Sequence, residues 1–113
     1  MFSELASSYL SKSIEKEIEN AETWGKDFSS NHEAYAVLKE EVEEASEELD
    51  DVKSALNIYW HLIRTNASED SMQLYIKNLN NKAFSAIKEL IQVIAVCHKT
   101  LKTIEEEEQD EIC

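Results

Sequence analysis

The chain has 113 residues, which is enough for one domain with a modest core. It carries 24 acidic residues against 11 Lys and Arg, and the resulting charge of −13 argues against direct nucleic-acid binding, which depends on clustered basic side chains. The chain has one Gly and no Pro, the residues that usually form the turns between β-strands, so the composition predicts an all-α fold.

The cysteine content and the hydropathy predict a cytoplasmic protein. The two cysteines, Cys97 and Cys113, form no disulfide framework and lack the spacing of metal ligands. The first 16 residues contain no continuous apolar stretch of the signal-peptide kind. No apolar run approaches the roughly 20 residues of a membrane-spanning helix, so we expect no membrane contact.

The first two predicted helices are separated by a short polar segment. Apolar residues recur at intervals of three and four from about Ser3 to Trp24, and Gly25 follows where a left-handed helix cap belongs. Ser30 and Glu33 have the spacing of a capping box, in which hydroxyl and carboxylate satisfy free amides at a helix start. A second helix is therefore expected to begin at Asn31.

The second helix is expected to run to about Thr65 and to pack along a nearly antiparallel neighbour. Its apolar residues alternate at three and four, the heptad pattern of long packed helices: Tyr35, Leu38, Val42, Ala45, Leu49, Val52, Leu56, Tyr59 and Ile63. A new start signal at Asn66 to Glu69 predicts a tight turn and a third helix that returns along the second.

The third helix is apolar on nearly all sides in its middle. Between Ile87 and Cys97 the only polar side chains are Lys88, Glu89 and Gln92. Such a helix is normally surrounded by protein, and three helices are too few to surround it, so we expect a dimer or tetramer. The sequence predicts a single all-α domain over 1–104, and an acidic, frayed tail over 105–113.

An acidic flank on the second helix is the first candidate for chemistry. At 100° per residue, Glu41, Glu44 and Glu48 lie within about 60° of one another along one side of the heptad stripe. Acidic helix faces are most often solvated surface. Glu89 and Gln92 strengthen a functional interpretation, because a carboxylate in an apolar stretch needs a cation or a donor. Salt bridging of Glu89 by Lys88 or Lys39 is the structural alternative.

These two motifs carry a resemblance to a known family. Glu40, Glu41 and Glu44 form a Glu-Glu-x-x-Glu helix motif, and Glu89 opens a second motif that Gln92 ends. Over about residues 30–100 the chain resembles the MazG-like, all-α nucleoside triphosphate pyrophosphohydrolases, whose second motif is Glu-x-x-Asp. The chain departs from that pattern in having Gln92 at the final Asp, and in a longer gap between the motifs.

The resemblance implies a Mg²⁺-dependent enzyme, with Mn²⁺ as the other candidate ion, that cleaves a nucleoside triphosphate to the monophosphate and pyrophosphate. Glu41, Glu44 and Glu89 would be metal ligands, and the amide oxygen of Gln92 would be a fourth. Glu40 or Glu48 would orient the attacking water. The candidate phosphate contacts, which rest on chain position alone, are Lys16, Lys26 and Lys39.

Two other classes of protein remain open on the sequence. An acidic helical interaction protein, such as a DNA mimic or an inhibitor of a nucleic-acid-binding protein, needs the charge but no particular residue on the third helix. An inactive relative of the enzyme family would keep the fold and lose turnover through Gln92. The catalytic interpretation requires Glu89 to face Glu41 and Glu44.

Overall fold

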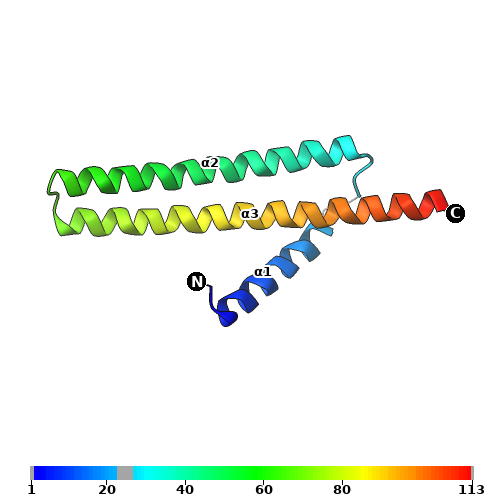
Figure 1. Ribbon diagram of the computed structural model, residues 1–113, viewed down its shortest axis with the longest axis horizontal. Helices are drawn as coiled ribbons and strands as arrows, with labels where there is room; N and C mark the ends of the chain where they lie inside the picture. The colour runs from blue at the N-terminus through cyan, green and yellow to red at the C-terminus, as the bar shows by residue number, and fades with distance from the viewer. Residues whose placement is uncertain (1, 23–26, 113) are drawn as a thin grey trace. The chain divides into compact units, whose positions relative to one another are not determined.

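The protein is all-α, as the composition predicts. The computed structural model describes residues 2–22 and 27–112, and these form α1 (Glu4–Glu22), α2 (Asn31–Arg64) and α3 (Glu69–Ile112) (Figure 1). The predicted end of the first helix at Trp24 and Gly25 lies outside the described residues. The chain divides into two compact units, residues 1–41 with 91–113 and residues 42–90.

A serine caps the start of every helix. The Oγ atoms of Ser3, Ser30 and Ser68 accept the backbone N–H three residues on, at 3.1, 3.2 and 3.2 Å. Each cap satisfies one of the amides that have no partner inside the first turn. The start of α2 at Asn31 is therefore confirmed.

The capping box of α2 differs from its prediction in one partner. The Glu33 carboxylate accepts hydrogen bonds from the Ser29 hydroxyl and from the Ser29 backbone N–H, the latter at 3.3 Å, so the reciprocal bond goes to the residue before the cap. The hydroxyl bond lowers the pKa of Glu33 most, followed by the backbone bond, and Lys99 adds a favourable charge.

The turn between α2 and α3 is built around Asn66. Its backbone φ is 52°, in the left-handed region. The N–H of Asn66 donates to Ile63 O at 3.2 Å, and that of Ala67 donates to Leu62 O at 3.0 Å. This is the Schellman arrangement, in which a left-handed residue just past the helix satisfies the last carbonyls. The turn reverses the chain and produces the predicted helical hairpin.

The first unit holds the small core of the protein. Phe28, Ala34 and Val96 are buried together, and Val37 and Leu38 pack against them half-buried. The ammonium of Lys99 lies 4.8 Å from the centroid of the Phe28 ring, so the aromatic face also contacts a cation. Phe28 thus links the segment before α2 to α3.

The second unit is a pair of antiparallel helices, residues 42–64 of α2 and 69–90 of α3, which lie side by side in Figure 1. Among its described residues the only buried hydrophobic side chains are Ala45 and Ala55. Lys82 Nζ and Asp51 Oδ2 are 3.9 Å apart across the pair. Because both side chains are partly exposed, this ion pair marks the register more than it stabilises the fold.

The predicted heptad stripe of α2 is divided between two environments. Alternate members pack against α3 and are buried or half-buried: Leu38, Ala45, Val52 and Tyr59. The other members are 39 to 67% exposed: Tyr35, Val42, Leu49, Leu56 and Ile63. Only half of the stripe is therefore used inside one copy of the chain.

The middle of α3 is only partly covered within one chain, and its end differs from what the sequence predicts. Within the apolar stretch Ala95 and Val96 are buried, but Ile87, Leu90 and Cys97 are exposed. A single chain does not supply enough protein to surround this helix. α3 also continues to Ile112, through the acidic segment, which holds no Pro or Gly to end a helix.

A candidate metal site on the helical hairpin

Two carboxylates of the candidate site come from one turn of α2. Glu41 is half-buried and Glu44 is exposed. They lie three residues apart, so they are neighbours on one face of the helix. Glu41 is the last residue of the first unit, and Glu44 belongs to the second, on the same continuous helix.

The third carboxylate comes from α3, and the register of the hairpin brings it in. The Lys82–Asp51 ion pair places residue 82 of α3 opposite residue 51 of α2. One heptad further along each antiparallel helix, Glu89 comes opposite Glu44 by the same count. Glu89 is half-buried in the second unit, as is expected for a residue at the edge of the packed seam.

The three carboxylates form a cluster. One ligand oxygen from each of Glu41, Glu44 and Glu89 lies within 4.8 Å of the others. Opposite ligands of Mg²⁺ are about 4.2 Å apart at its usual bond length, and the larger Ca²⁺ admits about 5 Å. Rotations that move an oxygen by under about 1 Å would let the set hold a hard divalent cation, and oxygen-only donors suit that class of ion.

The cluster fits a cation electrostatically as well as geometrically. Three carboxylates at this spacing repel one another, by about 1 kcal/mol per pair in water and by more where burial lowers the dielectric. A divalent ion bound between them would replace that repulsion by attraction. This arrangement of Glu89 toward Glu41 and Glu44 is the geometry that the catalytic interpretation requires.

Gln92 has a partner that the sequence does not indicate. Its amide Nε2 donates a hydrogen bond to Glu17 Oε2 of α1 at 3.1 Å, and both side chains are half-buried. The bond uses the nitrogen, so the amide oxygen keeps its capacity to accept or to bind a cation. Glu17 was missed because it lies among other acidic residues of α1, with no spacing that sets it apart.

The remaining predicted site residues are spread over the surface. Glu40 is exposed and Glu48 half-buried on α2, and neither belongs to the three-carboxylate cluster. Lys16 and Lys39 are exposed on α1 and α2, and Lys26 lies outside the described residues. Lys88 was one of the salt-bridge partners suggested for Glu89. Its ammonium lies 5.2 Å from the centroid of the Phe84 ring.

Two hollows open along the hairpin of the second unit, and sequence reasoning did not identify either. One, of about 250 Å³, is lined by Val42, Ala45, Ser46, Leu49, Ala86 and Leu90. The other, of about 400 Å³, lies near the turn and is lined by Tyr59, Glu69, Met72, Gln73, Ile76 and Lys77.

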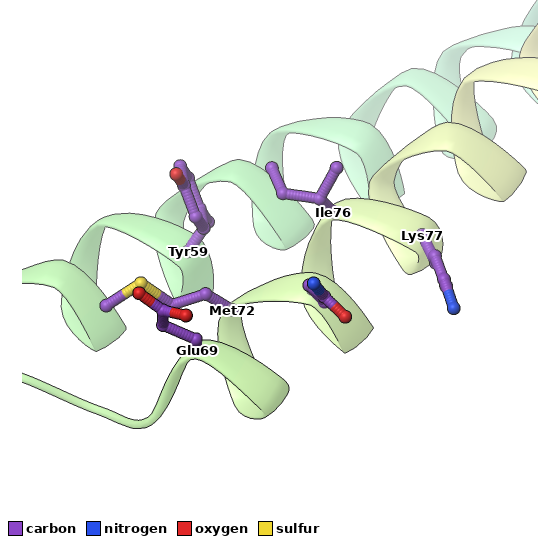
Figure 2. A pocket seen from close by; sticks show the side chains of 6 residues that line it. Tyr59, Glu69, Met72, Ile76 and Lys77 are labelled. Atoms are coloured by element: carbon purple, nitrogen blue, oxygen red, sulfur yellow. The ribbon is translucent and has the colours of Figure 1, made fainter.

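The hollow near the turn lies far from the carboxylates. Figure 2 shows Tyr59 of α2 beside Met72 and Ile76 of α3, with the Lys77 side chain pointing away from Tyr59. Tyr59 follows Glu44 by 15 residues, which is about 22 Å along a helix. Tyr59 is therefore too distant to stack on the base of a nucleotide whose phosphates lie at the cluster.

Comparisons with protein-family models, with curated proteins and with solved structures found no match to this chain. Across 2–22 and 27–112, no helix combines the length and the hydropathy needed to cross a membrane.

Proposed function

We propose that this protein is a divalent-cation-dependent nucleoside triphosphate pyrophosphohydrolase of the MazG-like kind. The observation that carries the proposal is the approach of Glu41, Glu44 and Glu89 to within 4.8 Å of one another. These residues come from the two motifs on which the resemblance rests, and they come together although 45 residues separate Glu44 from Glu89 in the sequence.

The carboxylates would act by holding Mg²⁺ or Mn²⁺ against the triphosphate of the substrate. A bound ion of this class polarises a phosphoryl oxygen and lowers the pKa of a coordinated water. Water oxygen forms a new bond to the α-phosphorus, and the bond from that phosphorus to the oxygen bridging it to the β-phosphate breaks. Pyrophosphate leaves with that bridging oxygen, and the water's protons pass to solvent or to a carboxylate.

The position of each remaining site residue suggests its role in this reaction. Glu48 follows Glu44 by one turn of α2 and is half-buried, which suits a carboxylate that accepts a hydrogen bond from the attacking water. Glu40 is the second candidate for this role, although it is exposed. Lys16, Lys26 and Lys39 are the candidate contacts for the phosphates.

Gln92 is expected to set the number of cations. Its neutral amide oxygen is a weaker ligand than the Asp of the family motif, and its nitrogen is already engaged by Glu17. We therefore propose one well-held ion at Glu41, Glu44 and Glu89, and at most a weak second one next to Gln92. Slow turnover, or none, would follow if both ions are needed.

Self-association and a cytoplasmic location belong to the same proposal. The exposed half of the α2 stripe and the exposed Ile87 and Leu90 of α3 support a dimer or tetramer, because exposed apolar surface on this scale is unusual for a monomer. A charge of −13 supports the absence of direct nucleic-acid binding.

The experiment that tests the function is pyrophosphate release from a panel of canonical and modified nucleoside triphosphates with Mg²⁺ or Mn²⁺. We expect turnover in the wild type that Glu41→Gln abolishes and that Gln92→Asp raises. Turnover only in Gln92→Asp would identify an inactive relative with the enzyme's fold. No pyrophosphate release by the wild type or by either variant would contradict an enzymatic function and favour an acidic interaction protein.

A further inference from the structure

The exposed apolar side chains of the second unit form one regular row. Val42, Leu49, Leu56 and Ile63 follow one another at intervals of seven residues on α2, and they are 52, 50, 53 and 39% exposed. Over these residues the helix rises about 32 Å. A row with this period and length fits another long helix, because only a helix repeats its side chains in the same way.

The two hollows lie on the same side of the hairpin as one another. Ala45, Ala86 and Leu90 line one, and the residues 14 positions away on each helix, Tyr59, Met72 and Ile76, line the other. Positions two heptads apart have the same orientation in a packed helix pair. The hairpin therefore has a hollow on this side near each end, and Glu69, Gln73 and Lys77 also line the one near the turn.

The row on α2 is complementary to itself when reversed. If two copies of α2 are laid antiparallel with Val42 opposite the partner's Ile63, Leu49 falls opposite the partner's Leu56, and every member of the row has an apolar counterpart. A second copy of this chain is therefore a matching occupant, and the pairing has the two-fold symmetry of most protein dimers.

The charges select the antiparallel orientation. The end of the hairpin formed by residues 42–51 and 82–90 carries seven acidic and two basic side chains, net −5, whereas residues 52–81 carry two acidic and three basic, net +1. Copies with their turns at the same end would place the two −5 ends together. Opposed turns place each acidic end beside a nearly neutral one, which electrostatics favours.

We propose that two copies of this chain pair face to face through the exposed α2 row and the hollows beside it, antiparallel, with their turns at opposite ends.

Distances between spin labels on the full chain test the pairing. In a Cys97→Ser, Cys113→Ser background, Lys53→Cys marks the middle of the face and Asp70→Cys marks the turn end. Both side chains are exposed, so labels are accommodated. We expect a separation between the two copies below about 20 Å for the first label and of at least about 30 Å for the second, from the rise of the helix.

The outcomes are distinct. A short distance between the labels at Asp70→Cys would contradict the antiparallel orientation. A protein that stays monomeric at all concentrations in sedimentation equilibrium would contradict the proposal that a second copy binds this face. Leu49→Glu, which places a charge inside the row, should weaken the dimer several-fold, whereas the control Ile58→Glu, at an exposed apolar position of α2 outside the row, should leave association unchanged. Equal weakening by Ile58→Glu would contradict a pairing through the row. These measurements do not involve turnover, so a failure of the pairing and a failure of the enzyme are told apart.

Discussion

The side-chain amide of Gln92 donates a hydrogen bond to the carboxylate of Glu17, with 3.1 Å between Nε2 and Oε2. The bond joins α1 to α3 inside the first unit. It also engages the residue that departs from the Glu-x-x-Asp motif of the MazG-like enzymes, which the chain resembles. Gln92 therefore has a structural role that an Asp at the same position would not fill in the same way.

Gln92→Asp is expected to lower stability while it adds negative charge. It replaces a charge-assisted hydrogen bond by two facing carboxylates, which should cost about 1–3 kcal/mol in the free energy of unfolding. Urea denaturation measures the loss. Glu17→Gln in the same chain should recover most of it, because the new amide can donate to the new carboxylate. No loss in Gln92→Asp would show that the hydrogen bond does not stabilise the fold.

The turn residue Asn66 gives a second prediction. Its φ of 52° is tolerated by Asn and Gly and is unfavourable for other residues. Asn66→Ala should therefore cost about 1–2 kcal/mol of stability, while Asn66→Gly should stay close to the wild type. Thermal denaturation of both variants measures this difference. Equal stability of the two would contradict a left-handed conformation at this position.

The N-cap of α3 gives a third prediction. Ser68 Oγ accepts the Ser71 N–H at 3.2 Å, so Ser68→Ala should lower the free energy of unfolding by about 1 kcal/mol. Ser54→Ala is the matched control, since Ser54 is exposed in the interior of α2 and Ala is the better helix former there. A loss of the same size in Ser54→Ala would show that the cap is not the cause.

Glu33 gives a prediction for pH. The hydrogen bonds from the Ser29 hydroxyl and backbone lower its pKa below the ordinary 4.5. The ionised carboxylate is therefore favoured in the folded state. The stability it contributes is fully present above pH 4.5, and it is lost as pH falls through the lowered pKa.

A pH titration of the Glu33 side chain by NMR measures this shift. Ser29→Ala removes the hydroxyl hydrogen bond, the larger cause of the shift, and should move the pKa of Glu33 upward, toward 4.5. A wild-type Glu33 that titrates at its ordinary value would show that these hydrogen bonds do not form in solution.

Much of the fold could be predicted because it depends on local signals. Ser30 with Glu33 fixed the start of α2, and Asn66 to Glu69 fixed the turn, since caps act within a few residues. The heptad stripe predicted a packed helix but not which half of it packs inside one chain. That depends on which helices are available, and one copy supplies too few.

The site was predictable in its geometry more than in its surroundings. Glu89 could be expected to face Glu44, because the heptad register of an antiparallel hairpin carries from one turn to the next. The partner of Gln92 could not be expected from the sequence. Glu17 is one of several acidic residues of α1, and the spacing of apolar residues in α1 and α3 does not predict the angle between the two helices. The two hollows are also products of packing between helices.

The most direct test of the central claim is a titration of the ¹⁵N-labelled protein with Mn²⁺, which broadens amide signals near the bound ion. We predict that substoichiometric Mn²⁺ broadens the amides around Glu44 and Glu89 first, that excess Mg²⁺ reverses the effect, and that Glu89→Gln weakens it by roughly tenfold or more. The exposed Glu47→Gln on the same helix is the control, and it should change nothing. Equal broadening at every acidic segment of the chain, unchanged in Glu89→Gln, would show that the three carboxylates are solvated surface and not a metal site.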